Sequence, residues 1–263
     1  MQDAVPSEQR RNDVLDPARA CALMAALGLP DRPVAGDALP PFSHQLYFWN
    51  AQPPGALGRD GHPRVGGVIP DLGLSRRMWA GGRMQFADPL RLGLPAKKRT
   101  YCDAVKETVG RSGPLAFVTL RHEIRQEGAL CVTEWQDLVY RPKADPSQAK
   151  SQPTAAPGQE GEPVRFDSTL LFRYSALTFN GHRIHYDESH ARQVEGYDGL
   201  VVHGPLLAQL LILKATRELG PLQAFSFRGH SPLMHHEEAV LCRAGPRLWV
   251  AGPDGRLVME ATV

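Results

Sequence analysis

The sequence predicts an α+β fold made of two similar halves, and three features indicate it. Segments rich in Val, Thr, Phe, Tyr and Trp at 99–109, 115–124 and 129–140 are typical of a half-buried antiparallel sheet. A proline-rich stretch at 141–163 has almost no bulky apolar residue and separates the halves. In the second half, one densely apolar helix precedes several short strand patterns, which favours a sheet wrapped around a central helix. We therefore expect a tandem of α+β units.

The first expected domain, 1–140, begins with a polar segment, 1–13, that predicts a disordered lead-in. Asp16 followed by Pro17 marks a helix start, and apolar residues at helical spacing continue to Gly28. The three strand patterns follow near the end of this domain, the last two joined by a glycine-containing turn.

A glycine- and proline-rich stretch lies between that helix and those strands, at 35–95. Its residues 42–49 predict a strand or a buried edge, and 75–86 predict a loop. The glycines lack the spacing of a phosphate-binding loop, so nucleotide binding is set aside. Arg76 and Arg77 make the loop basic, and they are either functional or simply solvated.

The second expected domain, 164–263, follows the linker at 141–163. We expect a strand at 166–176, then a short helix capped by Asp187. The apolar helix starts at Gly204 and ends at Gly220. Four strand patterns follow, at 222–228, 238–243, 248–251 and 256–263.

Composition narrows the class of protein. The 263 residues are 42% hydrophobic and 22% charged, as in ordinary globular proteins, and the net charge of +2 argues against a bulk nucleic-acid binder. No apolar run approaches the roughly 20 residues of a membrane span, and the polar N-terminus does not have the apolar core of a secretory signal. The four cysteines are scattered. We expect a reduced, cytoplasmic protein with no nucleic-acid or membrane partner.

Titratable and polar residues concentrate between two apolar flanks in the second half. Asn180, His182, Arg183, His185 and Asp187 occupy eight consecutive positions. Burying unpaired polar groups costs free energy, so such a cluster indicates a site. His185 is suited to general acid–base work near neutral pH.

The helix that starts at Gly204 offers a second element of a site. Pro205 has no backbone N–H, which leaves Gly204 and Leu206 as donors that could face an oxyanion. The run His235-His236-Glu237-Glu238 predicts a surface turn rather than a metal site, because adjacent strand positions face opposite ways. We expect no metal site.

The order YSALTFNGHRIHYD, then EGYDGLVVHGPL, resembles the hydratase signature of the MaoC-like family, Y-x3-[ST]-G-D-x-N-P-[IL]-H-x-D. Tyr174 and Thr178 match its start, and Ile184, His185 and Asp187 match its end. The chain resembles in particular the mesaconyl-C4-CoA (itaconyl-CoA) hydratases and the mitochondrial 3-hydroxyacyl-thioester dehydratases. The stretches DGHPRVGG, SRRMWAGG and EWQDLVYR extend that resemblance to the first half.

This resemblance implies a double hot-dog fold and assigns roles to residues. His185 takes the place of the catalytic histidine, Asn180 that of the catalytic aspartate, and the Gly204 N–H that of the donor to the thioester carbonyl. Since an amide cannot carry a proton, His185 is left as the single assigned proton carrier.

Substrate contacts are implied for Tyr174, Val202, His203 and Arg183. Arg183 either binds a carboxylate of the substrate or pairs with Asp187, and both readings stay open. The first half is expected to be a non-catalytic wall of the cleft.

The implied activity is the reversible hydration of a 2-enoyl-CoA, with C5 dicarboxylic substrates such as mesaconyl-C4-CoA or itaconyl-CoA as candidates. No cofactor is expected beyond the CoA of the substrate, and a homodimer is one option for the assembly. Two alternatives remain: an acyl-CoA thioesterase on the same fold, and a non-catalytic protein that binds acyl thioesters.

Overall fold

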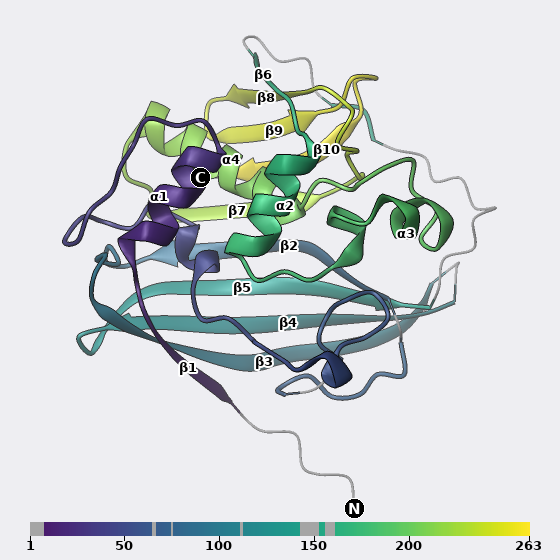
Figure 1. Ribbon diagram of the computed structural model, residues 1–263, viewed down its shortest axis with the longest axis horizontal. Coiled ribbons are helices and arrows are strands. Elements are labelled where there is room, and N and C mark those ends of the chain that lie inside the picture. The colour runs from purple at the N-terminus through teal and green to yellow at the C-terminus, as the bar shows by residue number, and fades with distance from the viewer. Residues whose placement is uncertain (1–7, 65–66, 75, 111–112, 143–152, 156–160) are drawn as a thin grey trace, which may run out of the picture.

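The fold is described from a computed structural model that covers residues 8–64, 67–74, 76–110, 113–142, 153–155 and 161–263. Ten antiparallel strands of these residues form one continuous sheet, in the order β1-β3-β4-β5-β2-β7-β10-β9-β8-β6. Figure 1 shows the helices gathered over one side of this sheet. The α+β class predicted from the sequence is confirmed.

The strands of the first half are β1 (Gln9–Val14), β2 (Arg76–Phe86), β3 (Pro95–Gly110), β4 (Gly113–Gln126) and β5 (Ala129–Arg141). Those of the second half are β6 (Gly161–Val164), β7 (Ala224–Gly229), β8 (Ala239–Ala244), β9 (Arg247–Ala251) and β10 (Leu257–Thr262). The helices are α1 (Pro17–Ala26), α2 (Ser168–Leu177), α3 (Glu188–Gln193) and α4 (Gly204–Leu219), with short 3₁₀ turns η1 (Ser43–Leu46), η2 (Pro54–Ala56) and η3 (Arg183–His185).

Strand β2 joins the two halves, because it pairs with β5 on one side and β7 on the other. Its glycines explain why the sequence predicted a loop here. A Cβ added at Gly81 would lie 2.5 Å from the Phe227 carbonyl oxygen, and one at Gly82 would lie 2.7 Å from that of Trp135. The glycines that weaken the strand signal are thus needed where three strands approach closely, and the loop prediction was wrong.

Three further local predictions were wrong. The 166–176 segment is helix α2, because Asp167 caps it at the Leu170 N–H (2.7 Å) and the buried Leu171, Tyr174 and Ser175 recur at helical spacing. Part of the predicted lead-in is β1, which pairs with β3. Residues 43–46 form a 3₁₀ turn, so the strand alternative for 42–49 was wrong, while the segment is buried as its other alternative expected.

One apolar core spans both halves. It includes Leu23 of α1, Phe42 beside η1, Leu211 of α4 and Phe227 of β7. The rings of Phe42 and Phe227 lie 5.8 Å apart, so a side chain of the first half packs directly on a strand of the second. The predicted boundaries at 140 and 164 stay a prediction, and most of the linker lies outside the described residues.

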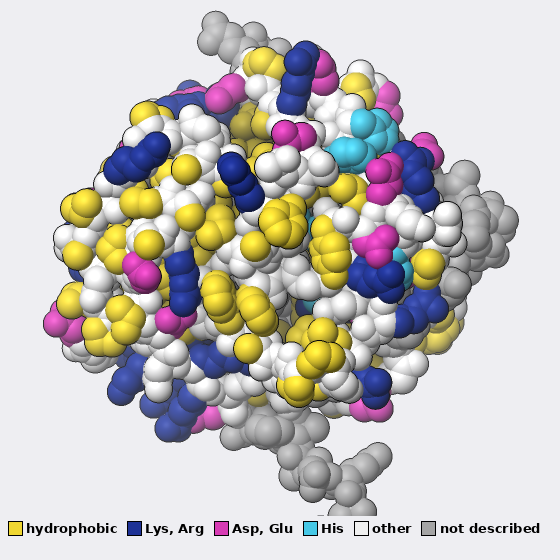
Figure 2. Space-filling model, viewed as in Figure 1, with side chains coloured by type: hydrophobic (Ala, Val, Ile, Leu, Met, Phe, Trp, Pro, Cys, Tyr) yellow, Lys and Arg dark blue, Asp and Glu magenta, His cyan; other side chains and the backbone are white. Residues whose placement is uncertain are grey.

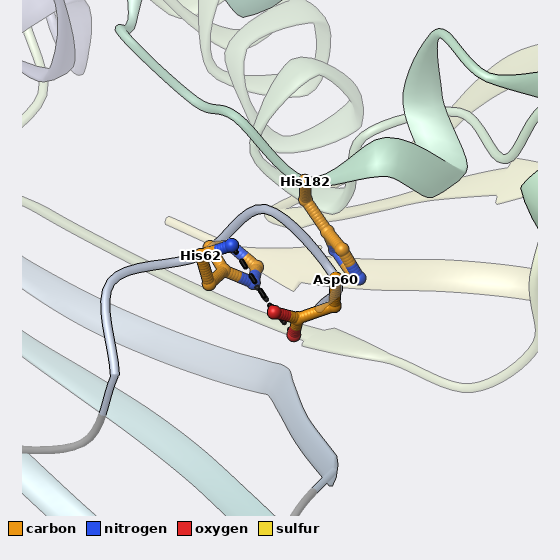
Figure 3. Close-up of side chains that lie close together, drawn as sticks. All are labelled: Asp60, His62 and His182. Atoms are coloured by element: carbon orange, nitrogen blue, oxygen red, sulfur yellow. Dashed lines mark hydrogen bonds and ion pairs between the residues drawn. The ribbon is translucent and has the colours of Figure 1, made fainter. Parts of the chain in front are cut away.

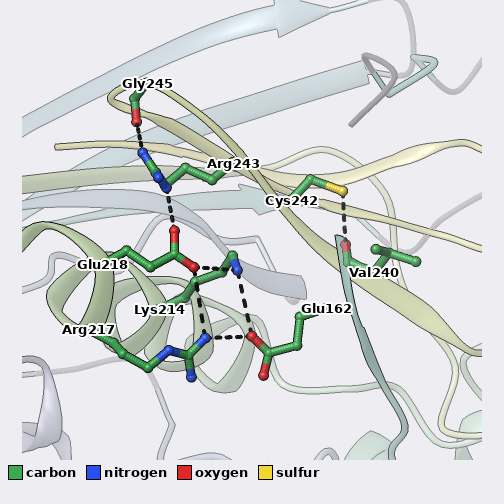
Figure 4. A network of polar contacts seen from close by, with 8 residues as sticks. All are labelled: Glu162, Lys214, Arg217, Glu218, Val240, Cys242, Arg243 and Gly245. Atoms are coloured by element: carbon green, nitrogen blue, oxygen red, sulfur yellow. Dashed lines mark hydrogen bonds and ion pairs between the residues drawn. The ribbon is translucent and has the colours of Figure 1, made fainter. Parts of the chain in front are cut away.

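Strand β6 takes in the last residues of the predicted linker and is tied to α4 by charges. Glu162 accepts from Arg217 (2.6 Å) and lies 3.6 Å from the Lys214 ammonium, while Glu218 accepts from Lys214 (2.6 Å) and from Arg243 of β8. Figure 4 shows this network across the end of the helix. It holds the edge strand to the buried helix that begins at the site.

The helix-covered side carries many hydrophobic side chains at its surface, and these gather near the middle of the view in Figure 2. Among the exposed ones, the ring of Trp49 stacks on that of Phe179 at 5.0 Å.

Within the described residues, no helix combines the length and apolarity needed to cross a membrane.

Candidate active site

Three segments meet at the candidate site: the stretch that follows α2, the start of α4, and the loop of the first half that carries Asp60 and His62. The C-terminus of α2 closes at Thr178, whose N–H and hydroxyl both donate to the Tyr174 carbonyl (3.0 and 2.7 Å). Phe179 then adopts a positive φ of 51°, and the Asn180 N–H returns to the Ser175 carbonyl (2.8 Å). This tight reversal directs the polar stretch, predicted from the sequence as a site, back toward the start of α4.

His185 is buried and has a defined tautomer. Its Nδ1 lies 2.7 Å from the Val201 carbonyl oxygen, which can only accept, so Nδ1 carries the hydrogen. The neutral ring therefore presents the Nε2 lone pair. Burial lowers the pKa of His185 to about 4, against the opposing effect of the Val201 hydrogen bond. At neutral pH this residue is a base.

His203 packs against one face of the His185 ring. The two rings stack at 3.7 Å, and Nε2 of His203 lies 2.9 Å from the Ser175 hydroxyl. His203 is fully buried, and burial lowers its pKa well below the usual range. The Tyr174 ring meets the His203 ring edge-on at 4.9 Å, and Val202 is buried beside them. These three residues form a wall behind the catalytic candidate, while their contacts with a substrate stay predictions.

The start of α4 offers one free backbone donor. The Leu206 N–H, predicted as a second donor, is bound to the His203 carbonyl at 3.0 Å, so that prediction was wrong. The Gly204 N–H donates to no acceptor in the described part of the chain. An added Cβ at Gly204 would touch only the Met259 methyl group, at 3.9 Å, so packing does not explain the glycine.

The orientation of the Asn180 amide is fixed by its neighbour. Its Oδ1 accepts from the His182 N–H at 3.1 Å, so its NH₂ group points the other way. Asn180 therefore presents hydrogen-bond donors to its surroundings. It cannot accept a proton.

Arg183 is held by Asp187 in the structure. Its Nε and Nη2 both donate to Asp187 Oδ2, at 3.1 and 2.7 Å, and its Nη1 donates to the Arg59 carbonyl at 3.3 Å. Asp187 also caps α3 through the His190 N–H (2.9 Å), as predicted. The structural pairing is thus present, while binding of a substrate carboxylate stays a prediction.

Two residues of the first half reach this site, and the sequence reading missed them. Figure 3 shows Asp60 and His62 facing His182, with the two imidazole rings 4.2 Å apart. The ring nitrogen Nδ1 of His62 lies 3.5 Å from Asp60 Oδ2, and the backbone N–H of His62 donates to Asp60 Oδ1 at 3.1 Å. The available signal was weak: the dipeptide Gly-His occurs at 61–62 in the first half, and at both 181–182 and 229–230 in the second.

Burial dominates the electrostatics of this group. It lowers the pKa of His182 to about 2, and it lowers that of His62 against the opposing effect of Asp60. Burial also opposes ionisation of Asp60, but hydrogen bonds and charge from His62 outweigh it and lower the Asp60 pKa to about 2. The group therefore combines one carboxylate with histidines that are neutral at pH 7.

Comparison with known proteins gives consistent relatives. A profile of the family described as hydroxyacyl-thioester dehydratase type 2 matches residues 42–235. The chain is 44% identical to a mesaconyl-C(4)-CoA hydratase of Chloroflexus aurantiacus, covering 98% of this chain and 94% of that protein. It is 27% identical to a mitochondrial hydroxyacyl-thioester dehydratase type 2 of Schizosaccharomyces pombe, over 81% of this chain and 80% of that protein.

Solved structures confirm the architecture. HtdX of Mycobacterium tuberculosis superposes with a TM-score of 0.69 at 18% identity, covering 97% of this chain and 98% of that one. A double hotdog protein of the same organism superposes with a TM-score of 0.60 at 13% identity, over 98% and 95% of the chains. The tandem hot-dog fold predicted from the sequence is confirmed.

Proposed function

Because this chain belongs to the hydroxyacyl-thioester dehydratase type 2 family, we propose that it is a hydro-lyase that reversibly hydrates a 2-enoyl-CoA to a hydroxyacyl-CoA. One observation carries the proposal. His185 is buried and stacks on His203, the residue that precedes α4. Within the described part of the chain, neither its Nε2 lone pair nor the first N–H of α4, that of Gly204, has a hydrogen-bond partner. This arrangement places a base beside an oxyanion donor.

In hydration, the oxygen of a water forms a bond to C3 while one of its protons passes to His185 Nε2. The π electrons of the C2–C3 bond then move toward the thioester oxygen, which the Gly204 N–H and the positive end of α4 stabilise. One proton is delivered to C2 to complete the addition. Dehydration follows the same steps in reverse.

Asn180 has a different role from that of a carboxylate at this position. Its NH₂ group donates a hydrogen bond to the water oxygen and so orients the water, while the second lone pair stays available for attack. Packing beside Gly204 is open, since only the Met259 methyl group lies within 4 Å of an added Cβ, and we infer that a thioester carbonyl reaches the Gly204 N–H here.

The proposed substrate is a C5 dicarboxylic enoyl-CoA of the mesaconyl-C4-CoA type, on the strength of the 44% identity to a protein of that name. CoA enters as part of the substrate, and no further cofactor is required by the steps above. Cytoplasmic location and a homodimer stay predictions.

The direct test is a panel of mesaconyl-C4-CoA, itaconyl-CoA and crotonyl-CoA, followed by the ultraviolet absorbance of the conjugated thioester. We expect the absorbance of at least one to fall and no free thiol to appear with DTNB. Thiol release would indicate a thioesterase instead. Binding without turnover, unchanged in His185→Ala, would indicate a non-catalytic binding protein.

A further inference from the structure

We propose that the Asp60–His62 pair of the first half is a second proton carrier at this site, and that it replaces the carboxylate absent at Asn180. The proposal rests on the hydration activity proposed above. It assigns His62 as a catalytic residue and Asp60 as the residue that positions it. The first half would then contribute chemistry as well as a wall.

The need for a second carrier follows from the Asn180 amide. An amide neither takes nor gives a proton, so Asn180 can orient a water but cannot act as its base. His185 is itself a single acceptor, since its Nδ1 is committed to the Val201 carbonyl. A base that takes a proton from water and an acid that gives one to C2 are most effective as separate groups with matched protonation.

The loop that carries Asp60 and His62 packs backbone to backbone against the catalytic stretch at Gly181. A Cβ added at Gly61 would lie 2.0 Å from the Gly181 carbonyl oxygen, and one at Gly181 would lie 2.7 Å from that of Gly61. The Arg183 N–H also donates to the Asp60 carbonyl at 2.8 Å. This contact holds the Asp60 loop against the catalytic stretch.

The rings then form a continuous series. His62 lies 4.2 Å from His182, and His182 lies 5.3 Å from His185, measured between ring centroids. Burial lowers the pKa of His62, and a hydrogen bond with the Asn180 side chain opposes that shift. His62 is therefore adjacent to the amide that would hold the water.

The environment of His62 defines its tautomer. Its buried Nδ1 has no well-aligned hydrogen-bond partner among the described residues and faces the Asp60 carboxylate at 3.5 Å. An Nδ1 lone pair beside that anion would be repelled, so the hydrogen lies on Nδ1 and Nε2 is the exchangeable position. Of the four histidines grouped here (62, 182, 185 and 203), His62 is the one within ion-pair distance of a carboxylate in the described structure.

His185 takes one proton from the attacking water and passes it through solvent to Nε2 of the neutral His62. The imidazolium that forms there, stabilised by Asp60, gives one proton to C2, and both rings are then neutral again. In dehydration His62 removes the C2 proton and His185 protonates the departing hydroxide.

A metal ion is the competing use of the same residues. The donor atoms of Asp60, His62 and His182 all lie within 4.8 Å of one another. A tetrahedral zinc needs its donors about 3.4 Å apart, given bond lengths of about 2.0–2.1 Å. The carboxylate is also already oriented toward His62 by the backbone N–H of that residue. These contacts favour a hydrogen-bonded acid–base pair.

The test compares Asp60→Asn and His62→Ala in the full chain, with Asp198→Asn as the control. Asparagine keeps the Oδ1 acceptor for the backbone N–H of His62, so Asp60→Asn preserves the loop contact. It removes the charge and replaces the Oδ2 acceptor that faces the His62 ring with an NH₂ donor. We expect kcat to fall about 100-fold in both variants with KM within about threefold of wild type. Added imidazole should restore kcat of His62→Ala by about tenfold. Asp198, whose side chain is 95% exposed, should be silent when changed.

Other outcomes would overturn the assignment. Wild-type kcat in folded Asp60→Asn and His62→Ala would remove the pair from the mechanism and leave the hydratase activity standing. A wild-type protein inactive on every enoyl-CoA tested would overturn both proposals. Loss of wild-type activity on chelation, with tight zinc binding that Asp60→Asn abolishes, would replace the pair with a metal centre.

A measurement on the wild-type protein is independent of how the variants fold. Long-range ¹H–¹⁵N spectra of the histidine rings report which nitrogen carries the hydrogen. We expect His62 and His185 to be Nδ1–H tautomers at pH 7. An Nε2–H tautomer at His62 would overturn the proposed proton route.

Discussion

Replacing Gly61 with alanine should separate the two loops that form the site. The added Cβ would lie 2.0 Å from the Gly181 carbonyl oxygen, and real contacts of this kind are essentially never below 3.0 Å. The loops must therefore separate by the difference, about 1 Å. A misplacement of about 1 Å at a catalytic site can lower the rate about 100-fold.

The stability cost of the Gly61→Ala change has two sources. Gly61 has a positive φ of 86°, a conformation that costs a residue with a Cβ about 1–2 kcal/mol. Overpacking against the facing backbone adds about 1–3 kcal/mol. The reduced entropy of the unfolded alanine chain offsets about 0.4–1 kcal/mol of this. The net loss is about 3 kcal/mol, or about 10 °C in Tm for a chain of this size.

Two matched variants separate these contributions. Gly28 has a φ of 70° and nothing within 4 Å of an added Cβ, so Gly28→Ala carries only the conformational cost. Gly181→Ala carries only the close contact, at 2.7 Å from the Gly61 carbonyl. Thermal unfolding by circular dichroism and the hydration rate of the enoyl-CoA are measured for all three.

We expect Gly28→Ala to keep wild-type kcat and lose about 3 °C in Tm, while Gly61→Ala and Gly181→Ala both lose activity. The reasoning is refuted if Gly61→Ala matches Gly28→Ala in both Tm and kcat. That result would mean that the loop of the first half is not held against the catalytic stretch.

Four further predictions concern the second half. His185→Ala should lower kcat by about 10²–10⁴-fold without loss of fold, and retention of the enoyl-CoA absorbance change at the wild-type rate would exclude His185 as the base. Since the pKa of His185 is about 4, the neutral base persists down to that range, and kcat/KM should show no acidic limb between pH 8 and 6. The unfolded histidine binds a proton near pH 6.5, so the unfolding free energy should fall by about 3 kcal/mol from pH 7 to 4 through His185 alone. This loss is checked by urea denaturation at each pH, and a constant midpoint would contradict the buried neutral ring. Arg183→Ala breaks a partly exposed pair with Asp187, for which we expect a loss of at most about 1 kcal/mol. A larger loss of kcat/KM on mesaconyl-C4-CoA than on crotonyl-CoA would favour the carboxylate role, and equal losses would exclude it.

The catalytic stretch was accessible from the sequence because its members are close in the chain. Asn180 and His185 lie on one reversal after α2, and Gly204 begins the next long helix. The density of leucines predicted α4 without knowledge of its partners, and seven of the ten strands in the described residues followed from residue type. Local order and local propensity were sufficient for these elements.

Strand β2 was misread because its conformation depends on partners that are distant in the sequence. The glycines of β2 argue against a strand until the carbonyl groups of Phe227 and Trp135 are placed beside them. Helix α2 has a short apolar run that periodicity alone does not distinguish from a buried strand. The Asp167 cap, three positions before Leu170, is a local helix-start signal that the strand prediction did not use.

By itself the sequence determined the class of fold, the family resemblance and a histidine beside a helix start as the centre of the chemistry. The tertiary structure decided the protonation state of that histidine and which residues lie around it. The His185 tautomer depends on a carbonyl of Val201, 16 positions away, and the approach of Asp60 and His62 depends on contacts that span more than 120 positions, such as that of Arg183 with Arg59. Hydrogen bonds and close packing are set by distance in space, and spacing along the chain carries little information about them.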